Sequence, residues 1–257
     1  MAEKDTTKKA RTGLPKKQGW MVALKVFLMT TWVAASVIVS QFAIGTLLVF
    51  IVGAENFERP IWSGVFAALS YSLALLLIIL PLKLIKKTRE RETIGLKGLP
   101  TWTDIGLAPI GFFAYFLLAA AFMWVFSLFP WFDVEQAQDV GFNVLASGFD
   151  RVVAFVTLVV LAPIAEEIIF RGWLYGRLRS QLLKCLPDWA SMLISILLVS
   201  ILFGVLHGQW NVGVNVFAMS IILCGLREIT GTIYAGILLH MLKNGIAFYA
   251  LFVLGIG

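Results

Sequence analysis

Apolar residues occur along this chain in long runs that are separated by short polar or proline-containing stretches. A helix needs about 20 apolar residues to cross the ~30 Å hydrocarbon core of a bilayer, and the strands of a membrane barrel are about half that length. Only helices and closed barrels satisfy all of their backbone hydrogen bonds in lipid. The pattern therefore predicts an all-α, polytopic transmembrane bundle of about seven to eight spans. The expected spans are about 21–53, 62–85, 104–129, 151–170, 190–207, 212–225 and 231–256.

One segment does not fit a simple span. Residues 171–184 mix leucines with Arg171, Arg177, Arg179 and Lys184. Such a segment either extends the preceding helix into the cytoplasm or lies along the membrane surface as an amphipathic helix. The sequence leaves both alternatives open.

Charge predicts the orientation in the membrane. The first 20 residues hold six Lys or Arg against two acids, and the stretch 83–97 is also basic. The stretch 131–150 carries four acidic residues and no basic one. Cytoplasmic loops are usually the basic ones, so we expect the N-terminus and the 83–100 loop in the cytoplasm and the acidic loop outside. The expected location is a plasma membrane, most simply that of a bacterium.

Composition narrows the classes of function. Hydrophobic residues make up 60% of the chain and charged residues 14%, which is typical of an integral membrane protein. The net charge of +6 is concentrated in the membrane flanks, so we expect the lipid bilayer as a partner and no nucleic acid. We expect residues 1–20 to be a disordered basic tail and residues 21–257 to form a single transmembrane domain. Cys185 and Cys224 are expected to be reduced and without a structural role.

Ionisable residues inside the apolar runs are the candidates for chemistry. The only two histidines, His207 and His240, lie in such runs, and so do Glu166 and Glu167. Each ionisable group costs about 2.5–3.5 kcal/mol at the centre of a membrane helix on insertion scales. Three separate apolar segments that carry such groups are best explained by one shared site.

Helical spacing places these residues at a similar depth. If the chain turns near Pro187, the two glutamates lie about 20 residues before the turn and His207 about 20 after it. With a second turn near 224–228, His207 and His240 are each about 12–17 residues from that turn. Antiparallel helices rise about 1.5 Å per residue, so the three positions are predicted to meet at one level.

Local spacing adds partners to the site. Glu167 and Arg171 are separated by four residues, the spacing at which a carboxylate and a guanidinium meet on one helix face. Glu166 is turned about 100° away and lacks that partner. The same spacing pairs His240 with Asn244, and Phe203 with His207, whose ring Phe203 is expected to flank.

Three sequence strings in this order resemble a known family. EEIIFR (166–171), FGVLH (203–207) and HMLKN (240–244) resemble the motifs EExxxR, FxxxH and HxxxN of the CPBP intramembrane proteases. That family includes type II CAAX prenyl endopeptidases and bacterial self-immunity (Abi) proteins. The string ETIGLKGLP (92–100) also resembles a loop of the family, so the resemblance covers about 92–250, with the motifs in 163–245. Family members commonly have about eight spans.

The resemblance implies an intramembrane endopeptidase that hydrolyses a peptide bond of a membrane-associated or lipidated peptide or protein. In the mechanism that we favour, Glu166, positioned with His207, removes a proton from water, which attacks the scissile carbonyl. Asn244 and His240 would then donate hydrogen bonds to the oxyanion. Glu167 belongs to the expected catalytic set, and Arg171 and Phe203 support it. Lys243 lies inside the third motif and either reaches to the membrane surface or tunes the charge of the carboxylates.

Zinc, or another divalent metal, is the alternative mechanism. Its ligands would be His207, His240 and either Glu166 or Glu167, with the other glutamate as base. No HExxH string is present to favour this alternative.

Two other classes of function remain open from the sequence. Glutamate and histidine relays also occur in proton-coupled transporters, although the chain shows no internal repeat. A catalytically silent immunity or scaffold protein on the same fold would carry the same motifs. The substrate, and the membrane face to which the site opens, are not fixed by the sequence.

Overall fold

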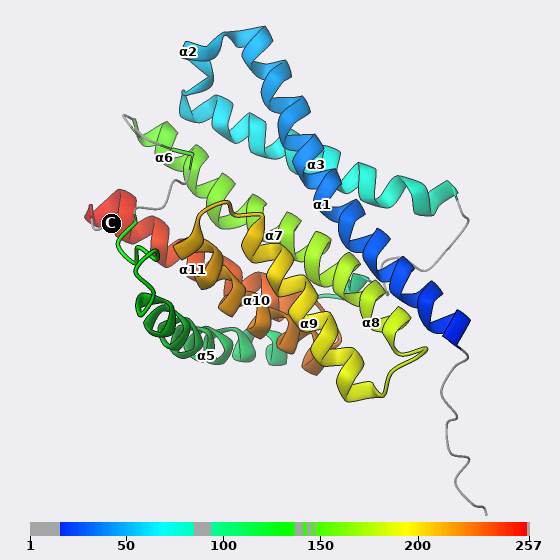
Figure 1. The fold of residues 1–257 in the computed structure, drawn as a ribbon. Helices are drawn as coiled ribbons and strands as arrows, with labels where there is room; N and C mark the ends of the chain where they lie inside the picture. The colour runs from blue at the N-terminus through cyan, green and yellow to red at the C-terminus, as the bar shows by residue number, and fades with distance from the viewer. Residues whose placement is uncertain (1–15, 85–93, 137–140, 143–144, 146, 256–257) are drawn as a thin grey trace, which may run out of the picture.

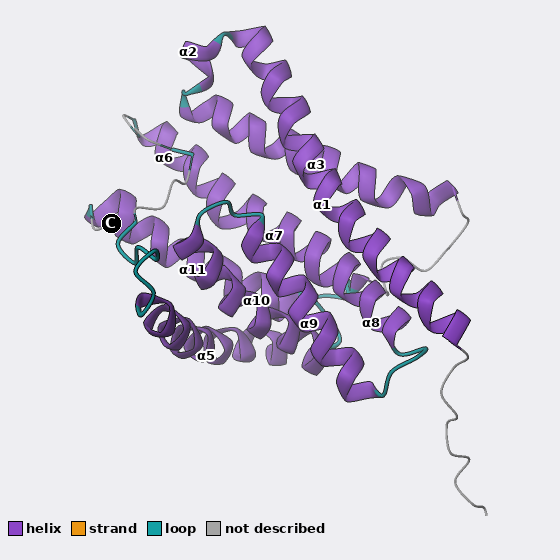
Figure 2. Ribbon diagram, viewed as in Figure 1, coloured by secondary structure: helices purple, strands orange, loops and turns teal. Residues whose placement is uncertain are grey.

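A computed structural model describes residues 16–84, 94–136, 141–142, 145 and 147–255. The described residues form helices and loops, without strands (Figure 2). Seven of these helices are long and apolar enough to cross a membrane. They cover 19–52, 60–80, 102–127, 148–182, 188–205, 210–230 and 234–254. The all-α bundle of about seven spans is therefore confirmed, and the chain is an integral, multi-pass membrane protein.

The elements follow one another in simple order. They are α1 (Lys16–Val52), α2 (Ala54–Phe57), α3 (Pro60–Leu84), α5 (Trp102–Ser127), α6 (Gly148–Phe155), η1 (Val156–Leu161), α7 (Ala162–Glu166), η2 (Glu167–Tyr175), α8 (Gly176–Leu182), α9 (Asp188–Val205), α10 (Trp210–Thr230), α11 (Tyr234–Tyr249) and η3 (Ala250–Leu254). The expected basic tail falls mostly on residues 1–15, which lie outside the described residues, and α1 begins at Lys16.

The segment after Glu167 continues the preceding helix. The elements α6, η1, α7, η2 and α8 join end to end, and the span 148–182 is 35 residues long. At about 1.5 Å per residue this helix is about 50 Å long, well beyond the thickness of the hydrocarbon core. Of the two alternatives that the sequence left open, the structure has the extended helix (Figure 1).

The helices form two connected parts. The antiparallel pair α1 and α3, blue to cyan in Figure 1, lies along one side of the bundle. On the other side α10 packs against both α5 and α9, and α11 packs against α5. The helices α9 and α10 approach very closely, because a Cβ at Gly204 would lie 2.8 Å from the carbonyl oxygen of Gly213. The long helix 148–182 runs between the two parts and contacts both.

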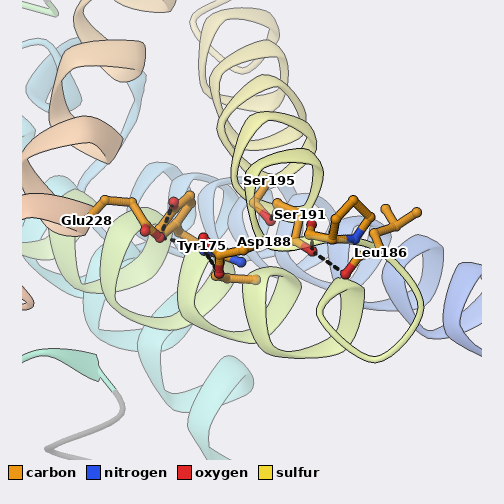
Figure 3. A network of polar contacts seen from close by, with 8 residues as sticks. Tyr175, Leu186, Asp188, Ser191, Ser195 and Glu228 are labelled. Atoms are coloured by element: carbon orange, nitrogen blue, oxygen red, sulfur yellow. Dashed lines mark hydrogen bonds and ion pairs between the residues drawn. The ribbon is translucent and has the colours of Figure 1, made fainter. Parts of the chain in front are cut away.

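A polar network ties α8, α9 and α10 together at one end of the bundle (Figure 3). The Tyr175 hydroxyl donates to Glu228, and Arg179 forms ion pairs with both Glu228 and Asp188 at 3.0 and 2.8 Å. Ser191 caps the turn by donating to the carbonyl of Pro187. This network fixes the turn that brings α9 back along the long helix, as the predicted hairpin requires. Cys185 and Cys224 are both free thiols.

Capping boxes start two of the spans. Thr101 and Asp104 cap α5 reciprocally, and Ser147 and Asp150 do the same for α6. Each side-chain cap typically contributes about 1 kcal/mol. The Asp104 carboxylate also accepts a hydrogen bond from Thr232 at 2.8 Å, which ties the start of α5 to the turn between α10 and α11. That turn fixes where α11, with His240, begins.

Candidate active site

The helix that carries the two glutamates is irregular on both sides of them. Two π-helical segments, η1 and η2, flank the short α7, which ends at Glu166. In a π-helix each N–H bonds to the carbonyl five residues earlier, as Ala162 does to Thr157. The next such donor would be Pro163, which has no N–H, so the carbonyl of Leu158 loses its partner. Single π-turns inside α-helices are frequent at functional sites.

Asn244 supplies the missing hydrogen bond. Its Nδ2 donates to the Leu158 carbonyl oxygen at 2.8 Å, across from α11 to η1. The amide is therefore committed through one N–H group to the backbone of the long helix, and a second N–H group remains. This bond locks α11 to the turn of helix that ends at Glu166.

Glu167 is fully buried and bound on two sides. Its Oε1 accepts a hydrogen bond from Arg171 Nη1 at 2.9 Å, which confirms the predicted pairing, and it also lies 3.1 Å from Nδ1 of His240. Its Oε2 lies against Gly236, where a Cβ would be only 3.1 Å away. Because a carboxylate can only accept, Nδ1 of His240 carries the proton in this contact. Glu167 thus orients the His240 ring and leaves its Nε2 facing away from Glu167.

Glu166 lies in a different environment. Its side chain is 14% exposed, and its Oε2 is 3.8 Å from His240 Nε2. Its Oε1 accepts a hydrogen bond of 2.5 Å from the hydroxyl of Tyr71 on α3. Nothing in the sequence pattern singled out Tyr71, because a tyrosine in an apolar span is common and its contact lies 95 residues away along the chain. Of the two acids, Glu166 is the more exposed.

Phe203 joins the two histidines. Its ring centroid is 4.8 Å from that of His207 and 6.2 Å from that of His240, both nearly edge-to-face. The Arg171 guanidinium lies over the same ring at 4.4 Å. The expected pairing of Phe203 with His207 is present, and Phe203 also shapes the wall between the histidines and Arg171.

His207 lies in the turn after α9. Its Nδ1 is 2.7 Å from the carbonyl oxygen of Phe203, so Nδ1 carries the proton and Nε2 holds the lone pair in the neutral ring. Burial lowers the pKa of His207 below the ordinary histidine value, and the nearby Glu166 carboxylate opposes this shift. His207 is therefore neutral near pH 7, with Nε2 able to accept a proton. Lys243 is half-buried and within electrostatic range of both Glu166 and His207.

The structure thus brings the sequence-predicted residues to one place from three helices, and a fourth helix, α3, adds Tyr71. Glu166, Glu167 and Arg171 come from the long helix, Phe203 and His207 from α9 and its following turn, and His240, Lys243 and Asn244 from α11. The convergence that the helical spacing predicted is present. The catalytic roles of these residues stay predictions.

Comparison with known families finds a match over the part of the chain that carries this arrangement. Residues 148–246 match the family described as type II CAAX prenyl endopeptidase Rce1-like. This segment is similar to that family. The match confirms the resemblance carried by the three motifs, all of which fall inside it. No curated protein and no solved structure gave a significant match. Tyr71 lies outside the matched residues, so α3 adds a contact that the family match does not cover.

The metal alternative would use His207, His240 and one of the two glutamates. No three His, Cys, Asp or Glu side chains among the described residues are grouped so that they could hold a metal ion. Each histidine uses its Nδ1 within the protein and keeps Nε2 as the atom that could accept a proton or bind a cation. Oε1 of Glu167 is shared between Arg171 and His240, whereas its Oε2 has no hydrogen-bond partner. The zinc alternative therefore stays a prediction beside the metal-free one.

Proposed function

We propose that the protein is an intramembrane endopeptidase in which Glu166 activates the attacking water. The observation that carries this proposal is the contrast between two adjacent acids. Glu167 is buried and neutralised by Arg171, whereas Glu166 is partly exposed and lies beside the imidazole of His240. The family match supports peptidase activity of the CAAX type, and the contrast supports Glu166 as the carboxylate that takes the proton.

The reaction would proceed in two steps. Water gives one proton to Glu166, helped by the free Nε2 of the neutral His207, and its oxygen forms a bond to the scissile carbonyl carbon. The oxyanion that develops accepts a hydrogen bond from His240, which in its doubly protonated form would donate from Nε2 while Nδ1 stays on Glu167. The C–N bond then breaks, and Glu166 returns its proton to the departing amine. No co-reactant other than water is needed.

Arg171, Glu167 and Tyr71 would position the reacting groups. Arg171 holds Glu167, and Glu167 holds the His240 ring. Tyr71 holds the Glu166 carboxylate by its hydroxyl. Asn244 acts on Glu166 through the helix, by its bond to Leu158, and can offer an oxyanion only its second N–H group. Lys243 would stabilise the negative charge that the reaction concentrates near Glu166.

The substrate class proposed is a peptide or membrane protein that reaches the site within or beside the bilayer. This follows from the position of the site inside a bundle of seven apolar helices. We further propose that the N-terminus lies in the cytoplasm, because the sequence is basic at the start of α1 and again after the end of α3.

A comparison of membranes tests the activity with no substrate chosen in advance. Membranes from cells that express the wild-type protein or Glu166→Gln are compared by mass spectrometry of new peptide termini. We expect termini that appear only with the wild type. Identical termini in both samples, at equal abundance of the two proteins, would refute the proposal. The same measurement on verified zinc-free protein tests the metal alternative. Full activity of the zinc-free protein would exclude zinc from the mechanism. Loss of activity in the zinc-free protein would overturn the metal-free mechanism.

A further inference from the structure

A cavity of about 580 Å³ lies beside the candidate site, outside the three motifs. It is bounded by α1 and α3 on one side, and by η1 and Phe142 on the other. Tyr71 and Ala162 both line it. Because the Tyr71 hydroxyl donates to Glu166, the cavity is separated from the proposed base by one side chain.

The lining indicates what the cavity could hold. Its lining includes several aromatic rings, among them Phe42, Phe66 and Phe142. Polar groups such as Gln41 and Thr157 lie between them. An apolar site with a few polar groups suits an extended peptide. Large apolar side chains of the peptide can pack against the aromatic rings, while the polar groups form hydrogen bonds with the peptide backbone. A pure hydrocarbon chain would leave those polar groups unpaired.

The packing around Glu166 differs between its two sides. Toward α8, all side chains of residues 169–175 are buried, and a Cβ at Gly172 would lie 2.5 Å from Ile94. The segment that begins at Ile94 therefore closes this end. Toward α6, the cavity reaches Gly141 and Phe142 of the acidic loop. An extended substrate has room on the side of that loop and none on the side of α8.

We propose that this cavity binds a large apolar side chain of the peptide substrate next to the scissile bond, and that the substrate approaches from the face of the acidic loop. This inference rests on the proposed function and extends it to the substrate class. With the N-terminus in the cytoplasm, the face of the acidic loop is the outer face. The preferred substrates are then apolar peptide segments presented from outside the cytoplasm.

A kinetic comparison tests the cavity. Ala67 lines it from α3, so Ala67→Phe fills part of the space, and Ser72→Phe places the same ring on the exposed face of the same helix as a control. Quenched peptides that differ only in one residue beside the cleaved bond, Leu or Ala, are assayed in liposomes. We expect Ala67→Phe to raise KM at least ~10-fold for the Leu peptide, with little change in kcat for that peptide and little change in KM for the Ala peptide. An equal change in KM for the two peptides, or equal changes from Ala67→Phe and Ser72→Phe, would overturn the proposal.

Photo-crosslinking tests the same cavity without turnover. A peptide that carries benzoylphenylalanine is bound to the Glu166→Gln protein in liposomes and irradiated. We expect crosslinks in residues 41–46 and 63–71, and fewer of them in the Ala67→Phe, Glu166→Gln double variant. Crosslinks confined to other helices would overturn the proposal. If the wild type cleaves no peptide, the proposed function fails, and the crosslinks still decide whether the cavity binds one.

A thiol block tests the face of approach. Ser63 lines the cavity near the start of α3, so Ser63→Cys is made with Cys185→Ser. In sealed vesicles of known orientation, we expect a membrane-impermeant maleimide to inhibit cleavage when it is added on the outer face. Inhibition only from the cytoplasmic face contradicts the proposed approach.

Discussion

Two neighbouring glutamates owe their different roles to their surroundings. Glu167 shares its Oε1 between Arg171 and His240 and is fully buried, whereas Glu166 is bound by Tyr71 and stays partly exposed. Removing one partner of a buried ion pair leaves the other charge uncompensated, which is far more costly than losing a partly exposed group.

Replacement of each glutamate by alanine should therefore separate stability from activity. We expect Glu167→Ala to lower the free energy of unfolding by about 3–5 kcal/mol, because Arg171 remains buried without its carboxylate. Glu166→Ala should lower it by only about 1 kcal/mol, since it loses mainly the hydrogen bond of Tyr71. Denaturant unfolding in detergent micelles measures both values. Equal losses in the two variants would contradict the assignment of roles.

Asn244 gives a second test at the residue scale. Its amide satisfies the Leu158 carbonyl, which Pro163 cannot bond. We expect Asn244→Ala to lower kcat about 10- to 100-fold, the effect of an unpaired buried carbonyl that costs about 1–3 kcal/mol and displaces Glu166. Pro163→Ala supplies the backbone N–H donor that the Leu158 carbonyl lacks in the wild type. The double variant should therefore recover most of the lost kcat.

The double variant distinguishes positioning from direct chemistry. If Asn244 acts only as a donor to the oxyanion, Pro163→Ala restores nothing, and the positioning role is refuted. Pro163→Ala alone is the control, and it should retain near wild-type kcat because Asn244 still holds Leu158.

Sequence reasoning was strong for local pairs at this scale and weak for distant ones. The Glu167–Arg171 pair and the Phe203–His207 contact follow from four-residue helical spacing. The Tyr71–Glu166 bond does not, because it depends on how α3 is rotated against the long helix, which no spacing rule fixes. The bond of Asn244 to Leu158 was also missed, although Pro163 marked in the sequence that a carbonyl nearby would lack its donor.

Among the elements, the π-helical segments decide the local geometry of the site. Their residues are as apolar as those of an ordinary span, so hydropathy predicts the helix and not its winding. The prediction of seven spans succeeded because length and hydrophobicity suffice for it. The continuation through α8 could not be predicted, since the leucine and arginine pattern of residues 171–184 suits both an extended and a surface helix.

The close approach at Gly172 gives a prediction for η2. A Cβ there would lie 2.5 Å from Ile94 Cγ2 and 3.0 Å from its carbonyl oxygen. We expect Gly172→Ala to lower the free energy of unfolding by about 1–3 kcal/mol, the usual range for overpacking. Gly225→Ala on α10 is the matched control, because its Cβ meets nothing within 4 Å and the change should be neutral or slightly stabilising. Equal behaviour of the two variants would show that the 94–100 segment does not pack on η2.

For the whole molecule, orientation in the membrane is the property that the charges predict. Cys185 lies half-buried in the turn between α8 and α9, which the positive-inside bias places in the cytoplasm, and Cys224 is fully buried. We expect a membrane-impermeant maleimide to leave Cys185 unlabelled in intact cells and to label it after permeabilisation. A Cys185→Ser protein is the control for labelling at Cys224. Labelling of Cys185 in intact cells would reverse the orientation.

In the proposed mechanism the bundle holds the partly exposed Glu166 close to the imidazoles of His207 and His240 in an apolar surrounding. The most direct measurement is the rate at which purified protein in liposomes cleaves a peptide found through its new termini, for the wild type and for Glu166→Gln at equal folded fraction. The predicted result is cleavage by the wild type and none detectable with Glu166→Gln. Cleavage by Glu166→Gln at the wild-type rate would contradict the assignment of Glu166 as the base.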